Sequence, residues 1–226
     1  MLSAASLTSP PIQAAPRSLV SLSAYLGPRI LILNNKGGVG KSTITTQLLT
    51  LLNQQGHRPA LVDFDPQGSS LQWAQEQPDL YAVDDDPRRA RLESMRLRVP
   101  ADAGCILMDS PANLDPALLS RLLGYADRIL LPCQANPLDV KALGRFLPDL
   151  LFHPQFRRRE PAIGVLANRL QSDNQTELLE RFLTPLKIPL LASLPERQQY
   201  RDAVVQNGHN ELDPQAWQRL LAWLEL

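Results

Sequence analysis

The 226-residue sequence predicts a single α/β domain built on a doubly wound, mainly parallel sheet flanked by helices. Three observations predict this fold. Short apolar runs that are typical of buried strands alternate with segments of helical periodicity. The first apolar run leads directly into a glycine-rich loop and then a helical pattern, which is the order found around phosphate-binding loops. Two later runs end in aspartates, at the strand ends where ligand sites of parallel sheets lie.

The first 28 residues differ from the rest of the chain. They are rich in Ser, Ala, Leu and Pro, contain no acidic residue, and carry Arg17 as their one charge. We expect residues 1–28 to be a flexible N-terminal tail, with a short helix over 18–26 as its one candidate element. The predicted domain then covers residues 29–226, and a hydrophobic content of 44% is enough to form a core.

The first strand and the loop after it form the predicted phosphate site. Apolar residues 30–33 predict the strand, and a helical pattern begins at Lys41. Because glycine has no Cβ, backbone N–H groups of the loop can turn toward a polyphosphate, and the helix N-terminus favours an anion. Lys41 can reach the β- and γ-phosphates, and the Ser42 hydroxyl can hold Mg²⁺. A chance glycine-rich turn is the alternative, but the flanking strand and helix favour nucleotide binding by Gly37, Gly38, Val39, Gly40, Lys41, Ser42 and Thr43.

Carboxylates follow two further strands of the predicted sheet. The strand at 60–64 ends at Asp63 and Asp65, and the strand at 104–108 ends at Asp109. Aspartate followed by proline is an ordinary turn former, so the first segment in isolation could be a capped turn. Downstream of a phosphate loop, a carboxylate at the tip of a buried strand is the arrangement that holds Mg²⁺ directly or through water. We therefore predict Asp109 as a metal-side residue, followed by a segment at 110–113 that responds to the γ-phosphate.

The remaining predicted elements continue the alternation of strands and helices. Proline directly after Asp115, Asn136 and Asp213 marks three helix starts. In chain order we expect a short strand at 81–83, a charged turn at 84–89, a helix over 92–97, a helix from 116, a strand at 128–133, a helix from 137, a solvated arginine loop at 157–159, a strand at 161–167, and helices at 198–207 and from 214.

The loop sequence KGGVGKST, with Lys36 ahead of the paired glycines, resembles the deviant Walker A box of the ParA/MinD ATPase family. Asn35 stands where the strict motif has glycine. The resemblance implies ATP and Mg²⁺ as cofactors and a homodimer with ATP sandwiched, in which Lys36 reaches across to the nucleotide of the partner subunit. It also matches residues 63–67 with the family's switch I, so that Asp65 positions the attacking water and Asp63 supports the Mg²⁺ shell. The implied catalytic residues are Lys36, Lys41 and Asp65, and the metal-side residues are Ser42, Asp63 and Asp109.

The same resemblance implies contacts outside the phosphate loop. Asn168, just after the strand at 161–167, matches an asparagine that binds adenine, and Pro195 lies in the loop that supplies a second base contact. Family members bind DNA without sequence preference, and the matching candidates are Arg197, Arg201 and Arg219. Overall charge does not support such binding independently, because 23 basic residues balance 23 acidic ones.

The resemblance therefore implies an ATP-dependent dimerisation switch that segregates or positions a plasmid, a chromosome or another intracellular cargo. A cargo-bound activator protein would stimulate hydrolysis and reset the cycle, in a cytoplasmic and nucleoid-associated protein. A MinD-like membrane-associated positioning ATPase is one alternative. It needs a C-terminal helix with a basic polar face, but in the last helix here the positive charge of Arg219 is balanced by the negative charge of Glu225. The other alternative is a P-loop metabolic ligase or synthase, which would need substrate-binding residues that the chain does not visibly supply.

The two cysteines argue against the iron–sulfur relatives of this family. Cys105 and Cys133 lie within apolar stretches, and Cys105 sits inside a predicted strand. No residue between Asp109 and Asn113 can ligate iron in their place. No apolar run reaches the length of a membrane span either, so membrane binding is not expected.

Overall fold

The protein is described by a computed structural model that places residues 18–85, 97–172, 175–196 and 214–226. Its centre is a seven-stranded sheet in the order β4-β3-β6-β2-β7-β8-β9, in which every neighbouring pair of strands is parallel. The strands are β2 (Arg29–Ile32), β3 (Pro59–Asp63), β4 (Tyr81–Asp84), β6 (Cys105–Asp109), β7 (Arg128–Gln134), β8 (Ala162–Leu170) and β9 (Leu190–Pro195). The predicted doubly wound α/β fold is confirmed.

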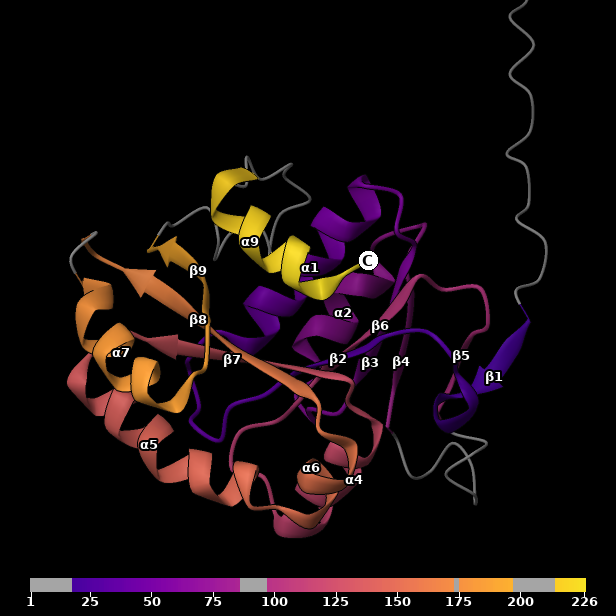
Figure 1. Ribbon diagram of the computed structural model, residues 1–226. Helices are drawn as coiled ribbons and strands as arrows, with labels where there is room; N and C mark the ends of the chain where they lie inside the picture. Colours follow the sequence, from indigo (N-terminus) through magenta and orange to yellow (C-terminus); the bar gives the residue numbers. More distant parts are fainter. Residues whose placement is uncertain (1–17, 86–96, 173–174, 197–213) are drawn as a thin grey trace, which may run out of the picture.

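Helices cover both faces of this sheet (Figure 1). One face carries α1 (Lys41–Gln54), α2 (Ser69–Gln75) and α9 (Pro214–Leu224). The other carries α4 (Pro116–Tyr125), α5 (Pro137–Leu151), α6 (Pro154–Arg159) and α7 (Thr176–Leu183), the last leading into η3 (Thr184–Leu186). Such two-sided cover buries parallel strands on both faces and explains why they are continuous apolar runs.

The apolar residues of β2 pack into two hydrophobic cores, one on each face of the sheet. Successive side chains of a strand point to opposite faces of the sheet. Ile30 and Ile32 therefore pack with α1 and α9, whereas Leu31 and Leu33 pack with α4 and α5. Because β2 lies between β6 and β7, its carboxyl end is the switch point of the strand order, where ligands of such sheets bind.

The predicted helix starts at Asp115 and Asn136 are confirmed. The Asp115 side chain accepts a hydrogen bond of 2.8 Å from the N–H of Leu118, and proline occupies the first turn of α4. Asn136 caps α5 in the same way, accepting from the N–H of Asp139 at 3.0 Å. Each cap satisfies an N–H group that has no partner inside its helix.

The packed part of the chain begins earlier than the expected boundary at residue 29. Residues Leu19–Ser21 form β1, which pairs antiparallel with β5 (Arg98–Pro100) in a small second sheet. A 3-10 helix, η1 (Leu22–Ala24), follows in place of the helix expected over 18–26, and Leu22 and Tyr25 are buried. The expectation of a tail reaching residue 28 is therefore wrong for this part, while residues 1–17 lie outside the described part of the chain.

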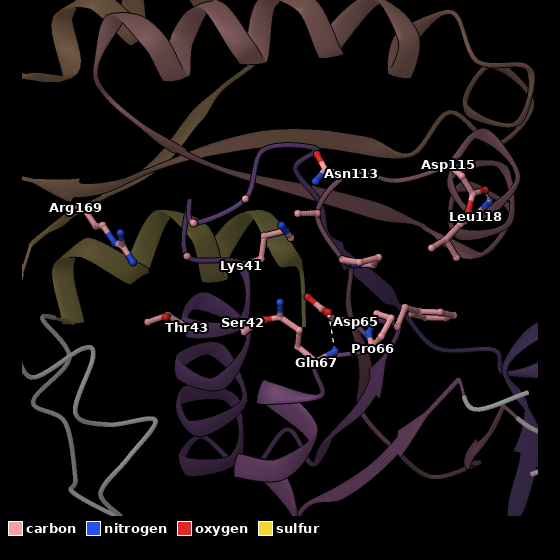
Figure 2. A pocket seen from close by; sticks show the side chains of 16 residues that line it. Lys41, Ser42, Thr43, Asp65, Pro66, Gln67, Asn113, Asp115, Leu118 and Arg169 are labelled. Atoms are coloured by element: carbon pink, nitrogen blue, oxygen red, sulfur yellow. Dashed lines mark hydrogen bonds between the residues drawn. The ribbon is translucent and has the colours of Figure 1, made fainter. Parts of the chain in front are cut away.

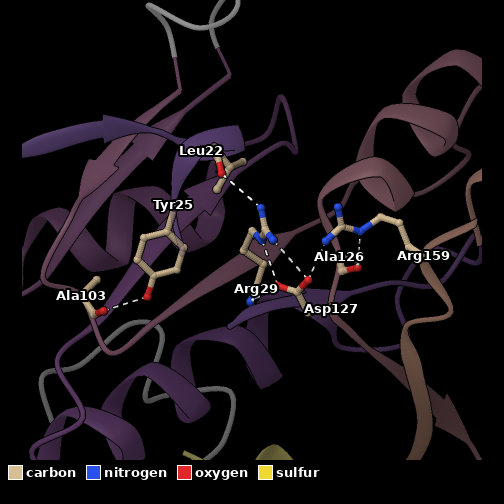
Figure 3. Close-up of polar contacts among 7 residues, drawn as sticks. All are labelled: Leu22, Tyr25, Arg29, Ala103, Ala126, Asp127 and Arg159. Carbon is tan, nitrogen blue, oxygen red and sulfur yellow. Dashed lines mark hydrogen bonds and ion pairs between the residues drawn. The ribbon is translucent and has the colours of Figure 1, made fainter. Parts of the chain in front are cut away.

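An ion-pair network fastens this N-terminal segment to the amino ends of the strands (Figure 3). Asp127 accepts from Arg29 Nε at 2.9 Å and from Arg159 Nη2 at 2.6 Å, and Arg29 Nη1 donates to the carbonyl of Leu22 at 3.4 Å. Tyr25 adds a bond of 2.7 Å from its hydroxyl to the carbonyl of Ala103. Burial alone would raise the pKa of Asp127, but the hydrogen bonds and charges of the two arginines outweigh it and hold that pKa below its usual value.

Of three further expectations, one meets a different structure and two fall mainly or wholly outside the described residues. The arginine run at 157–159 is the last turn of α6 rather than a loop, where basic side chains face the negative end of the helix dipole. The helix expected over 92–97 falls mainly on residues outside the described part, and Leu97 directly precedes β5. The helix expected at 198–207 also lies outside it, whereas α9 begins at Pro214 as predicted.

Candidate nucleotide-binding site

The phosphate loop lies at the carboxyl end of β2, beside a cavity of about 640 Å³ (Figure 2). Two of its glycines have left-handed backbone angles, with φ of 76° at Gly38 and 97° at Gly40. A Cβ on Gly40 would stand 2.3 Å from Nδ2 of Asn168, so a side chain is excluded there by both strain and space. The cavity is lined by residues of the loop, of the predicted switch I and of the segment that follows Asp109.

Lys41 opens α1 and is almost completely buried, with 7% of its surface exposed. Its ammonium lies 3.4 Å from the carbonyl oxygen of Lys36, to which it donates. Burial lowers the pKa of Lys41, while the nearby carboxylates of Asp109 and Asp65 oppose this shift. A buried cation that faces carboxylates across a cavity is suited to a polyanionic ligand that brings a divalent metal with it.

Asp109 carries the best evidence for a metal. It is fully buried at the end of β6, and neither carboxylate oxygen has a hydrogen-bond partner in the described part of the chain. Burial and the charge of Asp63 raise its pKa to about 7, against the opposing influence of the Ser42 and Ser70 hydroxyls and of Lys41. Burying a carboxylate without a hydrogen-bond partner costs free energy unless a cation compensates its charge. Together with the Ser42 hydroxyl, the Asp109 carboxylate forms a set of oxygen donors that fits Mg²⁺.

Asp63 organises the turn at the end of β3. Its Oδ1 accepts from the N–H of Asp65 at 2.9 Å, and its Oδ2 accepts from Ser70 Oγ at 2.7 Å and from the N–H of Leu71 at 3.0 Å. Burial raises its pKa in spite of these bonds. Asp63 therefore builds the turn that presents Asp65 and starts α2. Its support of a Mg²⁺ shell, which the resemblance implies, stays a prediction; Asp63 lies opposite Asp109 in the strand register.

Asp65 lies where a water-positioning residue would be needed. It lines the cavity together with the phosphate loop, and Figure 2 shows its carboxylate below Lys41. Its Oδ1 accepts a bond of 2.9 Å from the N–H of Gln67, which limits the rotation of the side chain. The carboxylate is therefore held by its own turn rather than by another element.

Lys36 forms an ion pair with Asp139, which the sequence did not single out. Asp139 lies in the first turn of α5 and is buried, whereas the Lys36 side chain is 38% exposed. The lysine that is expected to act across a dimer is therefore held by its own subunit here. The sequence offered no signal for this pair, because the two residues meet only through the packing of α5 beside the loop.

Asn35, the residue in place of the motif's first glycine, joins the loop to the segment after Asp109. Its carbonyl accepts from the N–H of Asn113 at 3.0 Å, and its Oδ1 accepts from the N–H of Leu114 at 2.9 Å. Asn113 has a left-handed φ of 53°. The departure from the strict motif thus connects the phosphate loop with the segment at 110–114 that follows Asp109, a role that glycine could fill only through its backbone.

Asn168 and Pro195, the two residues expected to bind adenine, do not lie at the same place in the structure. Asn168 is buried against the phosphate loop, where its Nδ2 donates to the carbonyl of Val39 at 2.9 Å and its Oδ1 accepts from the N–H of Arg169 at 3.0 Å. Pro195 ends β9 and does not line the cavity, whereas Arg169, which the sequence did not single out, does. Adenine binding by Asn168 and Pro195 stays a prediction.

The candidate DNA contacts are only partly described. Arg197 and Arg201 lie outside the described residues, and Arg219 is exposed on α9. This helix packs on the sheet as expected, through the buried side chains of Trp217, Leu220 and Leu224. Across the ranges that the structure places, no helix combines the length and the apolar character needed to span a bilayer.

The cysteines do not form a cluster site. Cys105 and Cys133 are both buried, and burial raises the pKa of each thiol to about 12, which disfavours the thiolate that iron needs. No group of three or more His, Cys, Asp or Glu side chains suited to a metal occurs among the described residues. The expectation that Cys105 lies within a strand is confirmed.

Comparisons with known proteins agree with this site. The model of the CobQ/CobB/MinD/ParA nucleotide binding domain family matches residues 30–209. Maintenance of carboxysome distribution protein A of Halothiobacillus neapolitanus is 30% identical over 186 residues, which are 78% of this chain and 83% of that protein.

Solved structures share the fold. A putative plasmid partition protein of Borrelia burgdorferi B31, bound to AMPPNP, superposes with a TM-score of 0.68 at 19% identity, over 88% of this chain and 99% of that one. The cell division ATPase MinD of Pyrococcus furiosus does so with a TM-score of 0.62 at 21% identity, over 88% and 99% of the two chains. By sequence and by fold, this chain belongs to the CobQ/CobB/MinD/ParA nucleotide-binding domain family.

Proposed function

We propose that this protein is a ParA-like ATPase, a dimerisation switch driven by ATP that positions an intracellular cargo. One observation carries the proposal: a phosphate loop with the extra Lys36 borders the same cavity as Asp65, and the strand beside it ends at the buried Asp109, whose carboxylate oxygens have no hydrogen-bond partner among the described residues. A relative whose name states the maintenance of carboxysome distribution supports a positioning role. A plasmid, a chromosome or another intracellular body is the proposed cargo class.

The phosphate chain of ATP would lie along the loop. Backbone N–H groups of residues 37–43 and the α1 N-terminus would bind its oxygens, and Lys41 would neutralise charge on the β- and γ-phosphates. Ser42 and Asp109 would hold Mg²⁺, which when bound offsets the charge that develops on the phosphate oxygens. Asp65, fixed by its bond from Gln67, would accept a hydrogen bond from the attacking water and direct that water toward the γ-phosphorus.

The switch would operate through Lys36. In the single subunit this side chain pairs with Asp139. We propose that binding of ATP lets two subunits associate face to face and that Lys36 then turns to the nucleotide of the partner subunit. An activator protein that carries the cargo would stimulate hydrolysis, after which the dimer separates.

Non-specific DNA binding belongs to the same proposal. The dimer would display a local basic patch that includes Arg197, Arg201 and Arg219, because the zero net charge provides no general attraction to DNA. The protein would accordingly act in the cytoplasm on the nucleoid. Membrane binding is not part of the proposal, since the apolar face of α9 is already buried against the sheet.

An electrophoretic shift on random duplex DNA tests the proposal. The expected result is binding with a slowly hydrolysed ATP analogue and none with ADP, together with a dimer in sedimentation under the first condition only. Lys41→Ala should abolish both changes, whereas Lys141→Ala, an exposed lysine on α5, should leave them intact. Vesicle binding that depends on ATP, or turnover of a small acid or amine, would instead establish one of the two alternatives.

A further inference from the structure

Arg169 is a strained residue at the nucleotide cavity. Its φ of 56° lies in the left-handed region, which is unfavourable for a residue with a Cβ. It lies within a register shift between β8 and β9, after Ala167 and before Leu170. Backbone strain of this kind persists only where the surrounding structure imposes it, and it collects at functional sites.

The neighbouring asparagine imposes this conformation. The Oδ1 of Asn168 accepts from the N–H of Arg169, while its Nδ2 donates to the carbonyl of Val39 in the phosphate loop. One amide side chain thus fixes the backbone of Arg169 relative to the loop. Because one donor and one acceptor position of this amide are used within the protein, its capacity to bind a base is reduced.

The guanidinium of Arg169, in contrast, is available. It lines the cavity, and it forms no hydrogen bond or ion pair within the described ranges 18–85, 97–172, 175–196 and 214–226. Figure 2 shows it on the Thr43 side of the loop, across the cavity from Asn113 and Asp115. Asp65 and Lys41, which would contact the terminal phosphate, lie between these two sides.

We propose that Arg169 is a further nucleotide-binding residue, whose guanidinium packs on the nucleoside end of the ligand, over the base and its ribose. This proposal rests on the proposed function, because it takes its orientation from a phosphate chain bound with its terminal phosphate toward Asp65. The planar guanidinium stacks on aromatic faces and is weakly hydrated, which suits contact with a purine ring. Because the backbone of Arg169 is left-handed, its side chain does not follow the direction of a regular strand residue and points over the cavity.

The test compares two ligands and two sites of equal strain. Displacement of a fluorescent ATP analogue by ATP and by inorganic tripolyphosphate, each with Mg²⁺, separates the nucleoside end from the phosphate chain. Arg169→Gly relieves the backbone strain and removes the guanidinium. Lys187→Gly is the matched control, because Lys187 is an exposed cation with a φ of 57° that does not line this cavity.

Arg169→Gly should weaken the affinity for ATP by between about twofold and thirtyfold, the range expected for a lost cation–π contact. Its affinity for tripolyphosphate should not change, and its melting temperature should stay equal or rise. Lys187→Gly should show the same thermal effect with unchanged affinity for both ligands. Arg169→Lys should recover only part of the ATP affinity, because an ammonium is not planar.

Three results would overturn the assignment. If Arg169→Gly loses affinity for ATP and for tripolyphosphate equally, Arg169 contacts the phosphate chain instead of the nucleoside. If Arg169→Lys recovers the full ATP affinity, a planar guanidinium is not needed. If Arg169→Gly binds ATP as tightly as the original protein, Arg169 has no role in binding. If the original protein itself does not bind ATP, the proposed function fails instead. The two failures are therefore distinguishable within one experiment.

Discussion

At the scale of single residues, the site depends on side chains whose own hydrogen bonds decide what they can do for a ligand. Asp63 accepts three bonds from the protein and is committed to the turn, whereas Asp65 accepts one from Gln67, and Asp109 accepts none within the described residues. A buried carboxylate whose oxygens accept few hydrogen bonds can still bind a metal or a water. A carboxylate whose oxygens already accept hydrogen bonds from the protein instead fixes the local backbone. The three aspartates therefore have separate roles despite their proximity.

Asp65→Asn should bind ATP and dimerise like the original protein but hydrolyse ATP about a hundredfold more slowly, because the neutral amide has one acceptor oxygen in place of two and is a much weaker base than the carboxylate. Single-turnover hydrolysis beside equilibrium binding measures the two properties. Asp102→Asn, in an exposed pair with Arg58, is the control and should change neither. Normal hydrolysis by Asp65→Asn would remove the water-positioning role.

Asn35→Ala should lower the free energy of unfolding by about 1 kcal/mol, because the N–H of Leu114 loses its acceptor in a half-buried place. Hydrogen exchange should accelerate at residues 113–114 before it does so elsewhere in the sheet. Urea unfolding and exchange mass spectrometry check the two parts. An unchanged exchange rate at these residues would show that the bond does not hold the segment, and Gln72→Ala on the exposed side of α2 serves as the control.

At the scale of elements, the strongest local signals gave correct predictions, and the errors fall where the local signals were misleading. The apolar runs of β2, β3, β6, β7 and β8 and the Asp-Pro and Asn-Pro caps are short-range features, so they can be identified without the fold. β9 was missed because it follows Pro189 and ends at Pro195, and proline is typical of turns. α6 was taken for a loop because three arginines hid its cap at His153.

The ion-pair network at the amino ends of β2 and β7 and the carboxyl end of α6 predicts a specific pH dependence. The pKa of Asp127 is lower in the folded protein than in the unfolded chain, so its contribution to stability is complete above the unfolded value and is lost as the pH falls through the folded one. Asp127→Asn should therefore lower the melting temperature at pH 7, and its deficit should shrink below about pH 4. Melting curves between pH 3 and pH 8 measure this, and a deficit that does not vary with pH would exclude the ionised carboxylate as the cause.

At the scale of the whole molecule, the site brings together residues from several elements, and Lys36 pairs with Asp139 of its own chain. The pairs that show this, Lys36 with Asp139 and Asn35 with Leu114, join residues far apart in the chain, and Asn35 and Leu114 are separated by 79 positions. A single sequence contains no signal for such contacts. The motifs of the candidate site were therefore predictable from the sequence, while these long-range pairs were not.

Lys36→Ala should bind ATP and Mg²⁺ with nearly unchanged affinity yet sediment as a monomer with a slowly hydrolysed analogue. The reason is that Lys41 remains at the nucleotide of its own subunit, whereas the contact with the partner is lost. Lys141→Ala, on the exposed side of α5, should dimerise normally. A stable dimer of Lys36→Ala would contradict the sandwich arrangement.

The network of Arg29, Asp127 and Arg159 also fixes where the chain enters the domain. Leu22 is bound at the amino end of β2, and the nucleotide cavity lies beyond its carboxyl end. The sheet therefore stands between the point of entry and the surface that would meet a second subunit. A fluorescent reporter fused ahead of residue 19 should leave that surface clear, which makes live imaging of the protein's distribution in cells practicable with a fusion at this end.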